Sequence, residues 1–421
     1  MNEIVLITRV RTLNKGNQAL SAAWLAMAQR AFPGAIIRLI ERRPRHLLQY
    51  TLKQIAATRD PIAAFEALTS KLALLAPGIE LAGTRVSRPE ILLDETIPPP
   101  PRFAALRQRL NLRGRLAAAG FYREEYRRRL SALERARLVI VNPAGEFFPR
   151  EPLAAYYHLL DVYVAHKLGR RTAIVNHTMD IDDPTLKRLI PHIYRSLDLV
   201  GFRDEKSVPA FRAMGGAVEN VLVTPDLALT TELRGTVSPR PGTVAVAINV
   251  PEAAAHGYLD GWSEVVAALL AEGLTVELVS NELPADQPYY EQLVRRHPAL
   301  KIAGAGLGHD GYAQLLGSYE LVITSRMHTG VLAMVAGCPV VPVEGASFKI
   351  TGLFQELGVT VPVIRPAQPG WAGQVIAQAR AMRSNRDGAA ADYAAKLAAV
   401  RQRIVQLLVP RLQAAAAAGS N

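Results

Sequence analysis

The segment 324–330, Thr-Ser-Arg-Met-His-Thr-Gly, carries the residue types best suited to chemistry in this chain. The apolar run 321–323 before it predicts a strand, and the polar residues predict a capped helix whose first turn contains Arg326 and His328. A helix N-terminus favours anions, because its first N–H groups lack partners within the helix and its dipole is positive there. Arg326 can hold a carboxylate or phosphate with two hydrogen bonds, and the His328 imidazole can act as an acid or a base. The pattern predicts a site for a phosphorylated or carboxylated ligand with proton transfer beside it.

Other polar turns follow predicted strands along the chain. The strands are short, apolar runs at 3–8, 138–142, 172–176, 197–202, 243–250 and 340–343. In a doubly wound sheet, ligands bind at the carboxyl ends of the strands. The candidate residues near these ends are Asn14, Gly16, Asn17, Glu146, His177, Arg203, Asp226, Asn249, Ser325, Thr329, Glu344, Ser347 and Lys349.

The order of the elements predicts an α/β protein with two Rossmann-like, doubly wound domains. We expect the first domain at 1–235, with a helical, basic insert at about 44–136, and the second at 243–373. Residues 374–421 are expected to be helical, and one arrangement open to them is to cross back to the first domain.

Length and composition agree with two globular domains. The chain has 421 residues, which is long for a single core, and 49% of them are hydrophobic. Its single cysteine, Cys338, excludes an internal disulfide and lies in an apolar run, so we expect it to be a small core residue. No spacing of cysteines and histidines fits a zinc site, and we expect no metal.

Positive charge is concentrated in the insert. The formal net charge is +12. Arginines crowd one segment, at Arg102, Arg107, Arg109, Arg113, Arg115, Arg123, Arg127, Arg128, Arg129, Arg135 and Arg137. Such a segment could bind nucleic acid, anionic lipid or an acidic polymer, or it could be a solvated helix face. No zinc finger or aromatic RNA-binding motif accompanies it, so we expect no nucleic-acid partner.

The chain begins with MNEIVLITRV, which has no basic region before a long apolar core and so predicts no signal peptide. No run reaches about 18 uninterrupted apolar residues, which predicts no membrane span. We expect a cytoplasmic protein, and peripheral contact with the inner face of the cell membrane stays open. An apolar stripe in the insert could lie on an anionic membrane, or pack on the first domain or a second subunit; it comprises Ile62, Phe65, Leu68, Leu72 and Leu75.

With the motif 324–330, the following segment Ala-Gly-Cys-Pro-Val-Val-Pro-Val at 336–343 and Lys349, the chain resembles the polysaccharide pyruvyl transferase family. Further segments resemble the family in the same order along the chain, at 13–19, at 202–207 with 224–226, and at 244–249. The resemblance implies a GT-B-like fold, in which the two domains face each other across a cleft.

The resemblance implies transfer of the enolpyruvyl unit of phosphoenolpyruvate onto two hydroxyls of a sugar, which gives a cyclic pyruvate ketal and free phosphate. The acceptor would be a sugar or a lipid-linked oligosaccharide in a cell-surface polysaccharide precursor. Phosphoenolpyruvate would be a co-substrate, and no cofactor is implied. The first domain would bind the acceptor and the second the donor. The reaction calls for an acid that protonates the donor's methylene carbon, a clamp for its anionic groups, and a base.

By resemblance, Arg326 would hold the donor's carboxylate or phosphate, and His328 would be the general acid or a protonated phosphate ligand. Positions two apart on a helix differ by about 200°, so both can face one ligand only if Arg326 lies at or before the cap. The alternatives are a structural ion pair for Arg326 and a backbone hydrogen bond for His328.

Each of the other candidates also has two interpretations. Lys349, with Ser347, could bind phosphate or lie on the surface. Arg203 could be a second anion ligand or pair with one of the acids that follow it, Asp204 and Glu205. Asp226 could be a base or a helix cap.

Glu146 could be a general base that takes a proton from the acceptor, and Glu344 could bind sugar hydroxyls. His177 could contact the substrate or be structural. Asn14, Gly16 and Asn17 could contact the acceptor or shape a turn. The remaining binding candidates are Asn249, Ser325 and Thr329.

Two alternatives to a pyruvyl transferase stay open. A sugar-nucleotide glycosyltransferase has the same two-domain layout and needs a carboxylate for ribose, a role open to Glu344. A non-catalytic basic module for anionic polymers or membranes would depend on the arginine-rich segment and not on Arg326 or His328. The sequence leaves the oligomeric state open, a homo-oligomer included.

Overall fold

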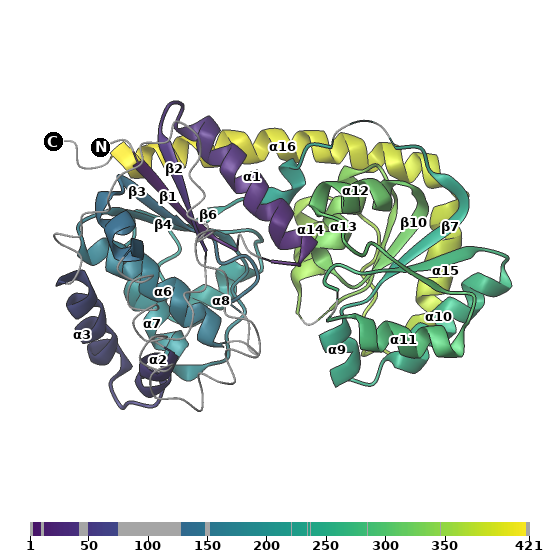
Figure 1. Ribbon diagram of the computed structural model, residues 1–421, viewed down its shortest axis with the longest axis horizontal. Coiled ribbons are helices and arrows are strands. Elements are labelled where there is room, and N and C mark those ends of the chain that lie inside the picture. The colour runs from purple at the N-terminus through teal and green to yellow at the C-terminus, as the bar shows by residue number, and fades with distance from the viewer. Residues whose placement is uncertain are drawn as a thin grey trace, which may run out of the picture.

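Two parallel sheets form the frame of the protein and lie side by side, with helices covering them (Figure 1). The computed structural model describes residues 3–9, 12–41, 49–74, 128–147, 152–219, 221–233, 235, 237–283, 285–345 and 347–417. This arrangement confirms the predicted α/β fold with two doubly wound domains.

The first sheet has the strand order β2-β1-β3-β4-β5-β6, and its strand pairs are parallel. Its strands are β1 (Glu3–Thr8), β2 (Ile36–Glu41), β3 (Leu138–Val141), β4 (Arg171–His177), β5 (Leu199–Phe202) and β6 (Leu222–Val223). The central strands are apolar and buried, as strands covered by helices on both faces must be. Because they all run the same way, the turns after β3, β4, β5 and β6 gather at one edge of the sheet.

Helices cover both faces of this sheet. They are α1 (Lys15–Ala31), α2 (Gln49–Ala56), α3 (Pro61–Leu74), α6 (Pro152–Lys167), α7 (Pro184–Tyr194) and α8 (Ser207–Ala213), with the 3-10 helix η1 (Leu227–Thr230) after β6. Side chains alternate along β1: Ile4 and Leu6 join the apolar cluster of α1, whereas Val5 and Ile7 join that of α6 and α7.

The second sheet has the order β11-β10-β7-β8-β9 and is also parallel. Its strands are β7 (Arg240–Ala247), β8 (Thr275–Val279), β9 (Lys301–Ala303), β10 (Tyr319–Thr324) and β11 (Val340–Pro342). Its helices are α9 (Val250–Ala255), α10 (Leu259–Ala271), α11 (Gln287–Arg296), α12 (His309–Gly317), α13 (Met327–Val335), α14 (Lys349–Glu356) and α15 (Trp371–Ser384).

The last helix, α16 (Arg386–Ala417), runs along both domains (Figure 1). In the second domain, the hydroxyl of Tyr393 donates to the carbonyl of Val340 at 3.2 Å. In the first, Gln413 Nε2 donates to the carbonyl of Ala31 at 2.9 Å. Hydrogen bonds near both ends of this helix therefore join the two domains.

The first helix begins earlier than the sequence pattern indicates. Residues 13–18 are predicted as a turn, but α1 starts at Lys15, with Asn14 as its N-cap. The Asn14 side chain accepts a hydrogen bond from the Asn17 N–H at 3.1 Å, which satisfies one of the helix's unpaired donors. Gly16 and Asn17 are poor helix formers, and this hid the start of the helix.

The insert is described in part, as α2, α3 and a helix at 128–135. Helix α3 packs against α6 and α7, and its residues Phe65 and Leu72 are buried there. Of the alternatives for the apolar stripe, packing on the first domain is therefore the one that α3 shows. Leu75 lies outside the described residues. Arg129 forms a buried ion pair with Asp161.

Most of the arginine-rich segment lies outside the described residues, namely Arg102, Arg107, Arg109, Arg113, Arg115, Arg123 and Arg127. Two described members make local or structural contacts. Arg135 Nη2 donates to Ser131 Oγ at 2.8 Å, and Arg137 Nε donates to the carbonyl of Ala416 at 3.3 Å.

Across the described ranges, no helix is long and apolar enough to cross a membrane. The same ranges hold no group of three or more His, Cys, Asp or Glu residues that could bind a metal ion. Cys338 is buried, and burial raises the pKa of its thiol to about 12, which fits a core residue.

Glu66 joins α3 to the domain core. Its carboxylate pairs with Lys167 Nζ at 2.7 Å and with His192 Nε2 at 2.8 Å, and it accepts a hydrogen bond from Tyr163. Burial opposes ionisation, but these partners together lower the pKa of Glu66 from 4.5 to about 2. Since the folded pKa is the lower one, the contribution to stability is present above pH 4.5 and is lost as the pH falls toward 2.

We expect Glu66→Gln to destabilise the protein most at neutral pH, in thermal unfolding followed by circular dichroism. The difference from wild type should shrink as the pH falls toward 2, where Glu66 itself becomes protonated. Glu264, an exposed acid on α10, provides the matched control Glu264→Gln. If the stability difference between Glu66→Gln and the wild type stayed constant from neutral to acid pH, the negative charge of Glu66 would play no part in it.

Candidate active site at the domain interface

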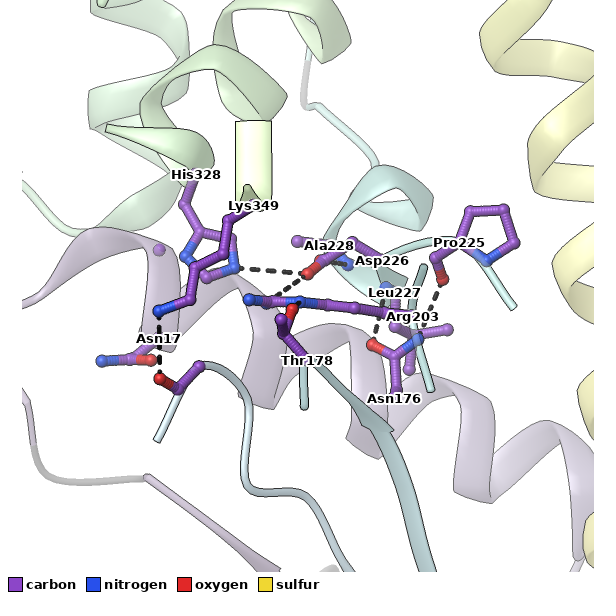
Figure 2. Close-up of polar contacts among 12 residues, drawn as sticks. Asn17, Asn176, Thr178, Arg203, Pro225, Asp226, Leu227, Ala228, His328 and Lys349 are labelled. Carbon is purple, nitrogen blue, oxygen red and sulfur yellow. Dashed lines mark hydrogen bonds and ion pairs between the residues drawn. The ribbon is translucent and has the colours of Figure 1, made fainter. Parts of the chain in front are cut away.

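A buried ion pair between Arg203 and Asp226 forms the base of a polar cluster where the domains meet (Figure 2). Arg203 follows β5 and Asp226 follows β6, so both lie at the carboxyl end of the first sheet. Arg203 Nη1 donates to Asp226 Oδ2 at 2.8 Å, and its Nε donates to Thr178 Oγ1, also at 2.8 Å. The two charged side chains are 3% and 2% exposed, so losing either would leave the other charge buried and unpaired.

Arg203 pairs with Asp226 and not with Asp204 or Glu205, which was one of its two interpretations from the sequence. The carboxylate of Asp204 instead caps α8, where it accepts hydrogen bonds from the Ser207 N–H at 2.9 Å and hydroxyl at 2.8 Å. It also accepts one from Thr178 Oγ1 at 2.9 Å. Thr178 thus links Arg203 to the start of α8 and fixes the direction of the guanidinium.

His328 reaches this pair from the second domain, on the first turn of α13. Its Nε2 lies 3.6 Å from Asp226 Oδ2, which is an ion-pair distance but too long for a hydrogen bond. This nitrogen is buried and has no hydrogen-bond partner within the part of the chain that the structure describes. The side chain is 14% exposed, so it keeps access to the domain interface.

Asp226 carries a permanent negative charge beside His328. Burial alone would raise the pKa of the Asp226 carboxyl, but the positive charges of His328 and Arg203 and a backbone hydrogen bond lower it well below its usual range. That hydrogen bond comes from the Ala228 N–H at 2.9 Å and makes Asp226 the cap of η1. A carboxylate that stays ionised can compensate a protonated imidazole.

Lys349 adds a second cation next to Arg203. It is the first residue of α14, and its Nζ donates to the carbonyl of Gly145 at 3.2 Å. A Cβ atom at Gly145 would lie 3.2 Å from Lys349 Nζ and 3.3 Å from Arg203 Nη2. Two cations from different domains therefore approach one point, and a glycine there leaves room beside them. Such a place suits an anion with several oxygens.

Two left-handed residues support the loops around this point. Ala144 has φ 54° and Asn176 has φ 58°, values that cost an ordinary residue about 1–2 kcal/mol. Asn176 compensates with its side chain: Nδ2 donates to the carbonyl of Pro225 at 2.9 Å, and Oδ1 accepts from the Leu227 N–H at 3.0 Å. These bonds tie the end of β4 to the turn that carries Asp226 (Figure 2).

Gly16 lets the N-terminus of α1 lie directly against the His328 ring. A Cβ atom at Gly16 would be 2.3 Å from the His328 Cβ and 2.6 Å from its Nδ1. The Gly16 N–H donates to Asn281 Oδ1 at 3.2 Å, and Asn14 Nδ2 donates to Glu282 Oε2 at 3.0 Å. The start of α1 therefore crosses to the second domain and packs on His328. Asn17 is half-buried, and its N–H is used by the Asn14 cap.

Arg326 is the N-cap of α13, which is the position that would let it face the same ligand as His328. Its guanidinium, however, is bound by other protein groups. Its Nη2 pairs with the carboxylate of Asp286, a residue that is 1% exposed. Its Nε donates to the carbonyl of Ile248 at 3.1 Å, and its Nη1 lies 3.9 Å from Glu282 Oε2. The structural ion pair, one of the two interpretations from the sequence, is the arrangement that the structure contains.

The candidates Glu344 and Ser347, near the start of α14, differ in their contacts. The Glu344 carboxylate accepts hydrogen bonds from the N–H groups of Ile350 and Thr351, both at 3.1 Å, and thus caps α14. Burial raises the pKa of Glu344, and these hydrogen bonds oppose the rise. The Ser347 hydroxyl is buried and has no hydrogen-bond partner among the described residues.

Ser325 and Thr329 lie inside the second domain. The Ser325 hydroxyl accepts a hydrogen bond from the Asn249 N–H at 2.7 Å, which ties the end of β7 to the turn after β10. Thr329 is fully buried, with its hydroxyl 3.2 Å from that of Tyr312. These contacts hold the base of α13 in position.

Glu146 and His177 lie behind the cluster. Glu146 Oε2 is 2.9 Å from His158 Nε2, and both residues are buried. His177 is fully buried, and its Nε2 lies 2.9 Å from the Tyr194 hydroxyl. Burial holds the pKa of His177 well below its usual range, and so do the nearby His158 and Arg203. His177 is therefore neutral and supports the floor of the site.

Sequence patterns missed several residues that build the cluster. The strand-end pattern points to Gly145 only together with Glu146, and it does not single out Thr178, Asn176, His158 or Asp286. Gly145, Asn176 and Thr178 lie at or soon after the ends of predicted strands, so their position was the available signal. Asp286 gives no such signal, because its pairing with Arg326 joins segments 40 residues apart.

The sequence model of the polysaccharide pyruvyl transferase family matches residues 14–347, which is most of the chain. This chain belongs to the polysaccharide pyruvyl transferase family. The match covers every residue of the cluster described above except Lys349, which lies two positions beyond its end. Membership places the protein among transferases of polysaccharide synthesis. No relative among curated protein sequences matches this pyruvyl transferase family member.

Solved structures share its fold. HepE from Anabaena, crystallised with UDP and glucose, is 16% identical with a TM-score of 0.52, over 98% of this chain and 99% of that chain. An α,α-trehalose-phosphate synthase (UDP-forming) from Burkholderia vietnamiensis is 11% identical with a TM-score of 0.53, over 96% of this chain and 95% of that chain. At such identities the likeness shows the fold alone, which is GT-B-like.

Proposed function

We propose that this family member moves the enolpyruvyl group of phosphoenolpyruvate onto two hydroxyls of a sugar in a cell-surface polysaccharide precursor. The product is a cyclic pyruvate ketal, and phosphate is released. The observation that carries the proposal is the approach of Arg203, Lys349 and His328 to one region between the domains. Phosphoenolpyruvate bears a phosphate and a carboxylate on adjacent groups, so it needs this density of positive charge.

Arg203 and Lys349 form the anion clamp in this proposal. Arg203 Nη2 and Lys349 Nζ lie within 3.3 Å of the point beside Gly145. The guanidinium is oriented before binding, because Thr178 and Asp226 hold its Nε and Nη1. Such preorganised charge lowers the free-energy cost of binding a multiply charged donor and stabilises phosphate as it leaves.

His328 is the proposed general acid. Its Nε2 has no hydrogen-bond partner in the described ranges, so it is available to give a proton to the methylene carbon of the donor. Asp226 lies 3.6 Å away and compensates the charge of the protonated ring. Protonation makes the neighbouring carbon electrophilic, and a sugar hydroxyl then attacks it.

In this proposal Arg326 does not bind the donor. It positions α13, the helix that carries His328. Its guanidinium joins the turn before α13 to Asp286 and to the end of β7. It thereby sets the direction of the helix that carries His328. Replacement of Arg326 would affect activity through the placement of α13.

The proposed acceptor is a sugar or a lipid-linked oligosaccharide. A lipid-linked acceptor would bring the protein to the inner face of the cell membrane, with the enzyme itself in the cytoplasm. The GT-B glycosyltransferase alternative would need a carboxylate for ribose, and both oxygens of Glu344 are used to cap α14. The cluster thus favours a small, multiply charged donor over a nucleotide sugar.

We expect Lys349→Met to weaken phosphoenolpyruvate binding. Losing one hydrogen bond to a charged group costs about 2 kcal/mol, so Kd should rise about 30-fold. Isothermal titration calorimetry would measure the affinity, with Lys187→Met as the matched control because that side chain is 45% exposed on the first domain. Binding of UDP-glucose in place of phosphoenolpyruvate by the wild type would contradict the proposed donor.

A further inference from the structure

The proposed reaction needs a base for the attacking hydroxyl, and most carboxylates beside the clamp are engaged. Asp226 pairs with Arg203 and caps η1. Asp204 caps α8 and accepts from Thr178. Glu146 is paired with His158. Asp183 caps α7, where it accepts from the Leu186 N–H at 2.8 Å, and it also accepts from the Tyr156 hydroxyl at 3.2 Å.

Asp180 differs from these four carboxylates. It is half-buried, and among the described residues none makes a hydrogen bond or a close ion pair with its carboxylate. Its neighbour Asp182 is 80% exposed and lies 3.8 Å from Lys187. Among the described acidic residues named above, Asp180 is therefore the one that is partly buried and has no hydrogen bond or close ion pair.

The backbone places Asp180 next to the anion clamp. Its N–H donates to the carbonyl of Phe147 at 3.1 Å, which joins its loop to the loop that contains Gly145. Two residues earlier, Thr178 accepts the hydrogen bond from Arg203 Nε. The loop that holds the guanidinium thus also carries Asp180, and both loops are at the carboxyl end of the first sheet.

We propose that the Asp180 carboxylate is the base that takes the proton from the first attacking hydroxyl of the acceptor. This inference rests on the proposed pyruvyl transfer. It puts the base on the first domain, opposite the acid His328 on the second. The acceptor would then bind between the two groups, with its hydroxyls directed at Asp180.

His328 and Asp180 together account for every proton transferred in the reaction. In the first step, His328 gives a proton to the methylene carbon, the hydroxyl oxygen bonds to the central carbon, and Asp180 takes the hydroxyl proton. In the second step, the bond between that carbon and the phosphate oxygen breaks, and the phosphate leaves with the electron pair and the proton from Asp180. The second hydroxyl closes the ring and returns a proton to His328.

The charges around Asp180 suit a base that must accept a proton. Burial raises the pKa of the Asp180 carboxyl, and the negative charges of Asp182 and Asp204 raise it further, while Lys349 opposes the rise. A carboxylate accepts a proton better when its pKa is closer to the operating pH. Since only the ionised form is a base, activity should fall on the acid side as Asp180 becomes protonated.

The test compares Asp180→Asn with Asp182→Asn as the matched control, using phosphoenolpyruvate and nitrophenyl hexosides with adjacent or alternate free hydroxyls. We expect Asp180→Asn to lower kcat about 100- to 10,000-fold, as loss of a general base does. The acid-side fall of kcat should disappear in the residual activity, and the Kd for phosphoenolpyruvate should change less than about threefold. Added formate should restore part of the activity of Asp180→Ala, because formate can supply the missing carboxylate.

Three results would overturn the assignment: an Asp180→Asn variant as active as Asp182→Asn, a loss confined to the KM of the acceptor with the wild-type pH profile, or no response of Asp180→Ala to formate. Circular dichroism and the donor Kd show that the variants are folded. Failure of the proposed function is distinct, because the wild type would then neither bind phosphoenolpyruvate nor release phosphate from it.

Discussion

Replacing His328 by asparagine is expected to lower kcat about 100- to 10,000-fold, because loss of a general acid removes that much rate. Asparagine keeps a polar side chain of similar size but cannot give a proton to carbon. The Kd for phosphoenolpyruvate should rise less than about tenfold, since Arg203 and Lys349 remain in place. Initial rates of phosphate release and calorimetry on the same preparations would measure both quantities.

The matched control is His256→Asn, because that histidine is 46% exposed and lies at the end of α9. It should leave kcat unchanged. A His328→Asn variant that keeps wild-type kcat, with only its donor affinity reduced, would mean that His328 binds phosphate and does not transfer a proton.

The second large effect is expected for Gly16→Ala, although Gly16 has no functional group. The added Cβ would be 2.3 Å from the His328 Cβ, and real Cβ atoms are essentially never found closer than 3.0 Å to such a neighbour. Either α1 or α13 must move. Overpacking of this kind costs about 1–3 kcal/mol of stability, and a displacement of about 1 Å at a reacting group costs about 100-fold in rate.

Thermal unfolding and kcat would measure the two consequences of Gly16→Ala. The matched control is Gly373→Ala, on the exposed face of α15 with no atom within 4 Å of the new Cβ. It should raise the free energy of unfolding by about 1 kcal/mol, since alanine is the better helix former, and leave kcat unchanged. Wild-type activity in Gly16→Ala would show that the contact of α1 with His328 does not position the ring.

The sequence pattern predicts the frame of the site well, for a physical reason. Parallel strands such as β3 and β5 are short runs of apolar residues, and the polar residues directly after them must lie at one edge of a sheet. Arg203, Asp226 and His328 follow strands in this way, and Lys349 begins the helix after β11. The insert could not be predicted so well, because the face of α3 that packs on α6 has the same apolar spacing as a membrane-binding face.

Contacts between residues that are far apart in the sequence could not be predicted from the sequence. The guanidinium of Arg326 is directed by Asp286 and not by its own helix, and Glu344 is turned toward α14 by two backbone N–H groups. From the pattern around 324–330, Arg326 and His328 are both predicted to bind the same anion. The structure separates them, because His328 faces Asp226 of the first domain, whereas Arg326 faces Asp286 of the second.

The most direct test of pyruvyl transfer is turnover by the purified protein with phosphoenolpyruvate and a panel of nitrophenyl and lipid-linked sugars, with phosphate release and acceptor mass measured together. We expect one phosphate released for each pyruvate ketal gained by the sugar, and loss of both products with His328→Asn. Transfer of a hexose from UDP-glucose to the same acceptors, with phosphoenolpyruvate neither bound nor consumed, would contradict the account and favour a glycosyltransferase.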